Sequence, residues 1–152
     1  MSRGYAAIAL DNPKNPLNVG AACRAVSCYD ASLIVLGGQR FRKWPTDTRK
    51  TWRHTPLLEV GDVFDAIPYD CVPVAVDLVA GAIALPQYVH PDRAFYVFGA
   101  EDATLGDRIL SRCRDRIFVP TRGCMNLAAA VNVVLYDRAA KRNEWVGEQE
   151  VA

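Results

Sequence analysis

The feature that most constrains the fold of this chain is a long apolar helix predicted near its C-terminus. Residues 119–137 have the pattern of a strand end, a polar loop and then a helix. Asn126 suits the N-cap position, because its side-chain oxygen can accept a hydrogen bond from a first-turn N–H group. Apolar residues follow at helical spacing and on the far side as well: Leu127, Val131, Val133, Val134, Leu135 and Tyr136. A helix that is apolar all round packs against a layer on each face, such as its own sheet and a partner subunit. A plain core helix is the alternative.

Length and composition favour one globular domain with a single core. The chain has 152 residues, of which 51% are hydrophobic and 23% are charged. The net charge of +1 means that any affinity for nucleic acid depends on a local basic patch. Five cysteines without a C-x-x-C pair, and two histidines, argue against a disulfide framework and a zinc cluster. We therefore expect no bound metal and a reducing, cytoplasmic location. No signal peptide begins the chain, and no apolar run approaches the roughly 20 residues of a membrane span.

Short apolar runs alternate with helical patterns along the chain. Five runs predict buried parallel strands: Tyr5–Leu10, Leu33–Leu36, Val72–Val76, Ala94–Phe98 and Arg116–Val119. Helices are predicted over 18–29, after Gly61, over 106–113 and over 126–142. This alternation predicts an α/β fold with a mostly parallel sheet flanked by helices, in one domain over residues 1–152. The polar tail 143–152 is expected to fray.

The first candidate site follows the first strand and enters the first helix. Gly20, Arg24 and Ser27 share one helix face. Since Gly20 has no side chain, another molecule can approach the helix beside Arg24, and a guanidinium suits a phosphate. The helix N-terminus adds free N–H groups. An ordinary surface arginine explains the same residues about equally well.

The second candidate site follows the strand that ends at Phe98. In open α/β sheets, ligands bind beyond the carboxyl ends of the strands. Gly99 would let a ligand lie against the backbone, and Glu101 could fix the loop or contact a substrate. Neither a dinucleotide fingerprint nor a Walker A sequence is present. The alternative is that Glu101 and Asp102 only cap the next helix.

The third candidate site is a basic, irregular segment within residues 37–56. Cations that could meet RNA phosphates alternate there with aromatic rings that could stack on bases: Arg40, Arg42, Arg49, Lys50 and Arg53 with Trp44 and Trp52. The alternative is a solvated loop anchored by its tryptophans. The two histidines have no evident catalytic partners, and we interpret His90 as a loop residue before Pro91.

Taken in order, these segments resemble the SPOUT superfamily of RNA methyltransferases, in its SpoU branch of ribose 2′-O-methyltransferases. The first family motif, Asn-x-Gly-x-x-x-Arg, is matched by Asn18, Gly20 and Arg24. The second, Gly-x-Glu followed by Gly-Leu, is matched by Gly99, Glu101 and Leu105. The third, a Pro, a short loop and Ser-(Leu/Met)-Asn, is matched by Pro120, Cys124, Met125 and Asn126. The match spans residues 5–142, and the chain looks most like the minimal proteins that methylate the tRNA wobble nucleotide.

The resemblance implies a fold that spacing alone does not predict. The family's C-terminal segment forms a deep trefoil knot, which general rules of chain connection would have excluded. It also implies a homodimer whose sites form where two knots meet. S-adenosylmethionine would lie bent in the knot, with eight residues assigned to it by position: Val76, Phe98, Gly99, Val119, Pro120, Cys124, Met125 and Leu127.

The implied reaction is an in-line transfer of a methyl group to a ribose 2′-hydroxyl. The resemblance favours tRNA as the substrate. The hydroxyl is a poor nucleophile and must lose its proton as it attacks. The family assigns Arg24 to this step, but an arginine stays protonated, so we interpret Arg24 as a phosphate clamp and electrostatic stabiliser. Asn18, Glu101 and Asn126 would position substrate and loops. RNA would contact Arg24 and the basic segment, and the reaction would need no metal ion.

Two residues depart from the family pattern. Cys124 stands where Ser is usual, and a thiol is a weaker donor. Thr104 stands where Gly is usual, and Thr would be strained if that position needs a positive φ. Four alternatives remain open: an rRNA 2′-O-methyltransferase, a catalytically silent RNA-binding protein on the same fold, a base methyltransferase, and a small nucleotide-binding or redox domain.

Overall fold

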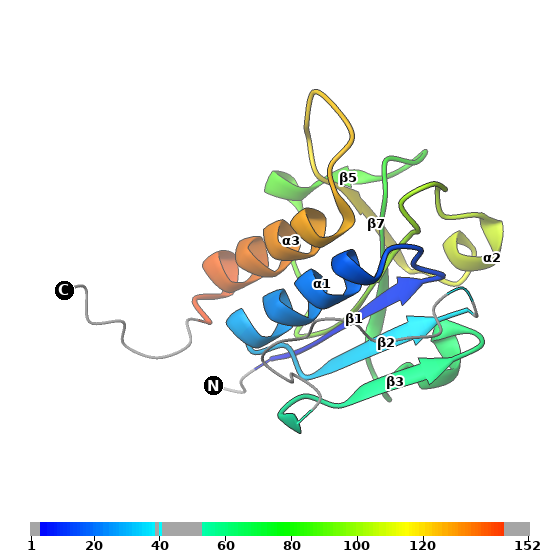
Figure 1. The fold of residues 1–152 in the computed structure, drawn as a ribbon. Helices are drawn as coiled ribbons and strands as arrows, with labels where there is room; N and C mark the ends of the chain where they lie inside the picture. The colour runs from blue at the N-terminus through cyan, green and yellow to red at the C-terminus, as the bar shows by residue number, and fades with distance from the viewer. Residues whose placement is uncertain (1–3, 39, 41–52, 145–152) are drawn as a thin grey trace.

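A computed structural model describes residues 4–38, 40 and 53–144 of the chain (Figure 1). The described strands form one seven-stranded sheet in the order β3-β2-β1-β6-β4-β7-β5, and every neighbouring pair is parallel. The strands are β1 (Tyr5–Asp11), β2 (Leu33–Gly37), β3 (Leu57–Val60), β4 (Val72–Val76), β5 (Ile83–Ala84), β6 (Arg93–Phe98) and β7 (Asp115–Phe118). The predicted α/β fold with a parallel sheet is thus confirmed.

The described helices are α1 (Pro16–Cys28), α2 (Asp107–Leu110) and α3 (Leu127–Arg142), with 3-10 turns η2 (Val63–Ala66) and η3 (Leu85–Gln87). Helices α1 and α2 lie between strands, and α3 follows the last strand, as the sequence pattern predicts. Sequence analysis missed the two edge strands β3 and β5. Both are too short to give a periodic signal, and Leu58 and Glu59 of β3 are exposed.

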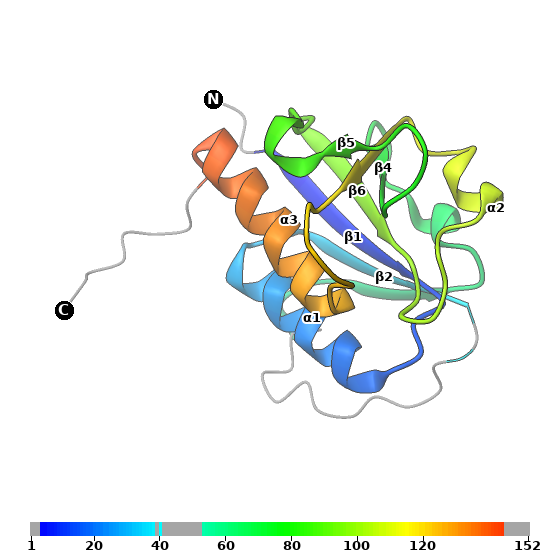
Figure 2. The ribbon, with the colours of Figure 1, turned by 90° about the horizontal axis from the view of Figure 1, so that it is seen from above.

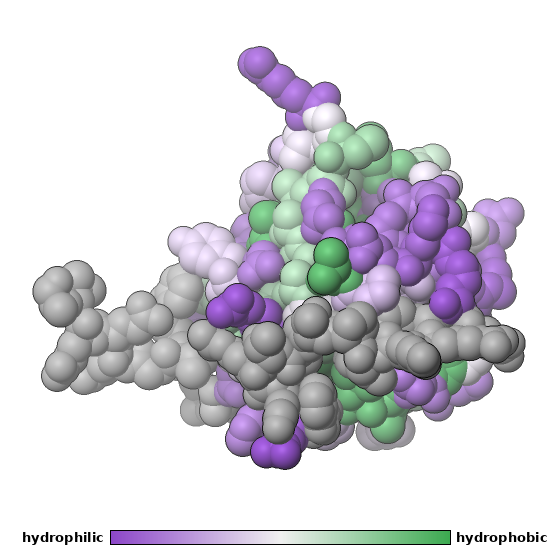
Figure 3. Space-filling model, in the orientation of Figure 1, coloured by the Kyte–Doolittle hydropathy of each residue, from purple (hydrophilic) through white to green (hydrophobic). Residues whose placement is uncertain are grey.

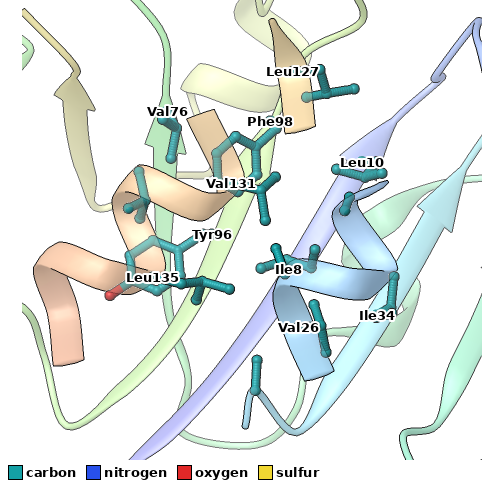
Figure 4. Close-up of a cluster of buried hydrophobic side chains, with 14 of the residues drawn as sticks. Ile8, Leu10, Val26, Ile34, Val76, Tyr96, Phe98, Leu127, Val131 and Leu135 are labelled. Atoms are coloured by element: carbon teal, nitrogen blue, oxygen red, sulfur yellow. The ribbon is translucent and has the colours of Figure 1, made fainter. Parts of the chain in front are cut away.

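Alternate residues of the central strands serve two separate cores. Ile8 and Leu10 of β1 face α1 and α3, which lie side by side over one face of the sheet (Figures 2 and 4). Ala7 and Ala9 face the other side, where η2 and α2 cover the sheet with Val63, Ile109 and Leu110. Burial on both faces explains why these strands are continuous apolar runs. No helix in the described part of the chain is long and apolar enough to cross a bilayer.

Both long helices begin at an asparagine N-cap. The Asn126 side chain accepts hydrogen bonds from the N–H groups of Ala128 (2.9 Å) and Ala129 (3.2 Å), so this predicted cap is confirmed. Helix α1 begins two residues earlier than the predicted Asn18, because Asn15 caps it and Pro16 occupies the first turn. Asn18 therefore lies inside the first turn of α1.

The outer side of α3 and its C-terminal end can be compared with the sequence-based expectations. Tyr136 on the outer side of α3 is 54% exposed, whereas Ala130 and Val133 are partly buried against the core of the same chain. A second layer over this helix stays a prediction. The tail expected to fray from Asn143 is held at its first two residues. Asn143 adopts a left-handed conformation that ends the helix, and the Glu144 carboxylate accepts a hydrogen bond from the Gly4 N–H at 3.3 Å. Residues 145–152 lie outside the described part.

A buried polar network fastens the C-terminal half of α3 to the sheet. His90, interpreted from sequence as a loop residue, is 4% exposed, and its ring nitrogens lie 2.6 Å from the Tyr96 hydroxyl and 2.7 Å from the Asp137 carboxylate. Arg138, also buried, donates to the carbonyls of Pro91 (2.6 Å) and Asp92 (2.8 Å). The pairing of every one of these groups offsets the cost of burying them.

The pKa of His90 predicts how stability depends on pH. Burial and the nearby cations Arg138 and Lys141 lower this pKa, against the opposing effect of Asp137. The unfolded chain therefore binds a proton at His90 at a higher pH than the folded chain does. Stability is fully present above about pH 6.5 and is lost as the pH falls toward the lower folded pKa.

Replacing His90 with Gln should remove this dependence. We expect the slope of the unfolding free energy against pH, up to about 1.4 kcal/mol per pH unit for one proton, to flatten between about pH 6.5 and 5. Urea denaturation at a series of pH values measures the slope. The control His54→Gln removes the exposed histidine and should keep the wild-type slope. An unchanged slope in His90→Gln would contradict the assignment.

Candidate active site

The sequence-predicted motifs meet at the carboxyl edge of the sheet. Strands β1, β6, β4 and β7 are consecutive neighbours and parallel, so the loops after them open at the same edge (Figure 1). Those loops contain residues 12–15, 99–105, 77–82 and 119–126. The first, second and third motifs thus come together although up to 108 positions separate them in the sequence.

A chain of hydrogen bonds joins the three motifs through Asn18, Glu101 and Asn126. The Asn126 Nδ2 donates to Asn18 Oδ1 at 2.9 Å, and Asn18 Nδ2 donates to Glu101 Oε1 at 2.7 Å. The Glu101 carboxylate also accepts from the backbone N–H groups of Lys14 (2.9 Å) and Asn15 (3.1 Å). One carboxylate therefore anchors the loop that leads into α1, and one amide connects it to the start of α3.

This arrangement keeps Glu101 ionised. Burial opposes its ionisation, but the hydrogen bonds from Asn18 and from the Lys14 and Asn15 amides outweigh that effect and lower its pKa. A carboxylate with a low pKa and three N–H donors is a poor proton acceptor. The geometry thus suits Glu101 to holding the loops in place, as the sequence analysis expects of it.

A cavity of about 720 Å3 opens beside this network, within the roughly 300–1,000 Å3 typical of small-molecule sites. The loops after β4, β6 and β7 and the first turns of α3 surround it. Its lining contains all eight residues assigned to the cofactor from sequence: Val76, Phe98, Gly99, Val119, Pro120, Cys124, Met125 and Leu127. The structure therefore brings this predicted set together around one space.

The loop 99–105 is shaped by its own contacts. A Cβ atom on Gly99 would lie 3.2 Å from the Ala103 carbonyl oxygen, so glycine there lets the loop fold back on itself. The Asp77 side chain, at the end of β4, accepts a hydrogen bond from the Leu105 N–H at 2.7 Å and fixes the far end of the loop. Thr104 is not among the described residues with positive φ, so the strain considered for this position is absent.

A second cavity of about 590 Å3 adjoins the first. Five residues line only this second cavity: Lys14, Asn15, Pro16, Asn18 and Asn126. Four residues line both cavities: Glu101, Cys124, Met125 and Leu127. Two ligands could therefore approach each other across the Cys124–Met125 segment. An arrangement of this kind permits the direct transfer of a group from one bound molecule to the other.

Three of the six predicted RNA-binding residues lie in the described part of the chain, and their surroundings differ. Arg24 is exposed on α1, lines neither cavity, and makes no hydrogen bond or ion pair within the described residues. Arg40 forms an ion pair with Asp102, and Arg53 is exposed. Arg42, Arg49 and Lys50 lie outside the described residues. Within the described ranges, no group of three His, Cys, Asp or Glu side chains could hold a metal ion.

Sequence analysis did not assign Lys14, Asp77 or Asp102 to the site. Asp77 follows the carboxyl end of β4, and this position is the signal that could have identified it. Lys14 and Asp102 gave no such signal, because their proximity depends on how two distant loops pack.

Replacing Glu101 with Gln should loosen the loop 12–15, because an amide nitrogen would face N–H donors. We expect the Lys14 and Asn15 amide protons to exchange faster with solvent, and the unfolding free energy to fall by about 1 kcal/mol. Hydrogen exchange followed by NMR measures the first effect and urea denaturation the second. Asp65→Asn, which removes an exposed carboxylate on the opposite face of the sheet, should change neither; unchanged exchange in Glu101→Gln would refute the anchoring role.

Solved structures share this fold. The SpoU methyltransferase AviRb from Streptomyces viridochromogenes, in complex with AdoMet, aligns with a TM-score of 0.79 and 18% identity, over 95% of this chain and 63% of that one. An AdoMet-bound rRNA methyltransferase from Sinorhizobium meliloti aligns with a TM-score of 0.80 and 22% identity, over 91% and 57% of the two chains. A structure described as giving insights into the 2-OH methylation of C/U34 on tRNA aligns with a TM-score of 0.76 and 22% identity, over 94% of both.

Membership of a family comes from the sequence itself. The chain spans only about three fifths of the AviRb and S. meliloti proteins, and identities this low establish the fold alone. No curated protein sequence matches it significantly. The model of the SpoU rRNA methylase family, however, matches residues 5–136, which include all three motifs and both cavities. This chain belongs to the SpoU rRNA methylase family.

Proposed function

We propose that this protein is an S-adenosylmethionine-dependent RNA methyltransferase that acts on a ribose 2′-hydroxyl. The observation that carries the proposal is the pair of cavities that meet at Cys124 and Met125. One is lined by every residue assigned to the cofactor, and the other by Asn18 and Asn126 of the motif network. A methyl donor and a nucleotide bound in them would face each other across a short distance, as an in-line transfer requires.

S-adenosylmethionine is the cofactor of the SpoU family. The larger cavity fits it in kind, because apolar side chains such as Val76, Phe98 and Leu127 are combined with loop backbone that can bind its polar parts. When bound, the sulfonium supplies an activated methyl group and needs no metal. The residues of this chain exclude water from the cavity and align the two ligands.

The proposed substrate is tRNA, with the wobble nucleotide as the first candidate. The structure described for C/U34 of tRNA aligns along 94% of both chains, so the similarity extends over nearly the whole of each. The rRNA methyltransferase from S. meliloti is much longer, since the alignment covers 57% of it. An rRNA substrate and a silent RNA-binding role are the alternatives that experiment must decide. A cytoplasmic location is proposed for either RNA substrate.

A homodimer with knotted C-terminal segments belongs to the same proposal. Apolar side chains are exposed over α1 and α3 (Figure 3), among them Leu17 at 65% and Tyr136 at 54%. A second copy of the chain would cover this surface. Because Arg24 lines neither cavity of its own chain, we propose that it acts as a phosphate clamp at the partner's site.

A methyl-transfer assay tests the function directly. Labelled S-adenosylmethionine and the purified protein should label bulk tRNA from a strain that lacks this gene, with the modified ribose resistant to alkaline cleavage. Label in the rRNA fraction would identify rRNA as the substrate instead of tRNA. Label on a base would identify the base as the methylated group instead of the ribose. Cofactor binding without label in any fraction would favour the silent RNA-binding protein.

Arg24→Ala should lower turnover by at least about 100-fold, because the guanidinium would stabilise transition-state charge. Cofactor binding, measured by isothermal titration calorimetry, should stay nearly unchanged.

Mixed dimers test the position of Arg24. An Arg24→Ala subunit combined with a Gly99→Val subunit, which cannot form the cofactor cavity, should regain up to about a quarter of wild-type activity if Arg24 serves the partner's site. No recovery in the mixed dimers would place Arg24 at its own site instead.

Cys124→Ser should strengthen cofactor binding, because a hydroxyl is a better hydrogen-bond donor than a thiol. The expected gain is about 2- to 10-fold in Kd, the equivalent of one ordinary hydrogen bond. Isothermal titration calorimetry with S-adenosylmethionine measures it. Cys28→Ser, at an exposed cysteine of α1 that lines neither cavity, should leave the Kd unchanged.

A further inference from the structure

Two cations and one carboxylate gather where the loops after β2, β1 and β6 meet. These strands are neighbours in the sheet, and their loops supply Arg40, Lys14 and Asp102 respectively. The Arg40 guanidinium contacts both carboxylate oxygens of Asp102, at 3.0 Å and 2.9 Å, and the Lys14 Nζ lies 3.8 Å from Asp102 Oδ2. The guanidinium thus makes the paired contact that it would also make with two oxygens of a phosphate.

Arg40 is held in place by contacts that do not involve Asp102, and the backbone of Lys14 is held in the same way. Arg40 also donates from Nη2 to the Asn12 carbonyl oxygen at 2.9 Å. Gly38 has a φ of +87°, and a Cβ atom there would lie 2.5 Å from Asn12 Oδ1, so the turn before Arg40 packs directly on Asn12. The backbone of Lys14 is anchored through its N–H group to Glu101. Removal of the Asp102 charge would therefore leave the Arg40 guanidinium near its present position, and the Lys14 ammonium within reach on an anchored backbone.

Asp102 itself does not hold the loop 99–105. Glu101 and Asp77 do so, through the backbone N–H groups of Lys14, Asn15 and Leu105. The side chains of Lys14, Asp102 and Arg40 are 64%, 44% and 36% exposed, and ion pairs this exposed contribute little to stability. The carboxylate is thus a replaceable anion between the anchored Arg40 guanidinium and the exposed Lys14 ammonium.

The position of this cluster relates it to both cavities. Lys14 lines the smaller cavity, and Asp102 lines the rim of the larger one. A nucleotide in the smaller cavity would therefore lie beside Lys14. The Arg40 guanidinium lowers the pKa of Asp102 to about 2, so the carboxylate remains an anion that competes for the cations at any physiological pH.

We propose that Arg40 and Lys14 form a phosphodiester-binding site for the substrate, and that the Asp102 carboxylate occupies this site in the free protein and is displaced by a substrate phosphate. The identification of this phosphate as part of an RNA rests on the function proposed above. Asp102 then weakens binding of any polyanion until a phosphate is presented in the geometry that both cations can contact. It acts as an internal competitor.

The test compares the binding of unmodified tRNA to Asp102→Asn and to Asp92→Asn by fluorescence anisotropy. Asp92 is a matched control, because its exposed carboxylate pairs with Arg142 at 2.6 Å at the opposite end of β6 and the charge change is the same. We expect Asp102→Asn to bind tRNA about 3- to 10-fold more tightly than wild type and Asp92→Asn to remain within 2-fold. Equal effects of the two variants, or weaker binding by Asp102→Asn, would overturn the proposal.

A second comparison tests whether the gain passes through the two cations. Lys14→Gln combined with Arg40→Gln should weaken tRNA binding about 10-fold and reduce the slope of log Kd against log salt by about one phosphate contact. Adding Asp102→Asn to this double variant should give no further gain, because the competitor then has nothing to occupy. A full gain in the triple variant would refute the displacement mechanism. Circular dichroism melts verify that all variants fold.

Pyrophosphate separates this proposal from the proposed function. If wild type and Asp102→Asn both fail to bind tRNA but Asp102→Asn binds pyrophosphate more tightly than Asp92→Asn, the phosphate site stands and the RNA substrate is wrong. If tRNA binds equally to all three proteins and labelled methyl is transferred, the function stands and the site is wrong.

Discussion

The Glu101 carboxylate is the contact on which the rest of the site depends. Its two oxygens accept hydrogen bonds from two backbone N–H groups and from Asn18, which in turn accepts from Asn126. Three loops from three different strands are fixed relative to one another by these few bonds. Both cavities lie against this network, so their shapes follow from it. The parallel sheet brings the loops to one edge, but only these polar contacts define how they sit there.

The molecule separates polar groups that must stay paired from those that can exchange partners. Under α3, His90, Tyr96 and Arg138 are buried, and breaking any one contact would leave a charge or donor uncompensated in a medium that solvates it poorly. At the opposite edge of the sheet, Arg40 and Asp102 are half exposed, and water can replace either partner. The first group suits fixing a helix, and the second suits recognition of a mobile, charged ligand.

Individual residues show how far sequence reasoning reached. The N-cap role of Asn126 was predictable because capping depends only on the residue and its next three neighbours. His90 does lie in the loop before Pro91, as interpreted from sequence, but its burial was not predictable, because its partners Tyr96 and Asp137 are 6 and 47 positions away. Gly99 was singled out for the approach of a ligand, which stays a prediction, and the structure adds that the atoms close to it belong to its own loop. The strain considered for Thr104 depended on a φ value that local sequence does not determine.

The sequence by itself determined the order of the five predicted apolar strands and of the helices, the N-cap of the last helix, and the three motifs. Each of these depends on local periodicity or on residue identity at short spacing. Only the tertiary structure decided which motif residues touch, that one cavity collects the eight residues assigned to the cofactor, and that Arg24 lies apart from them. It also decided that Asp102 lies between Arg40 and Lys14. These facts depend on the packing of loops that are far apart in the chain, and such packing is fixed by the whole sheet and its two cores rather than by any single segment.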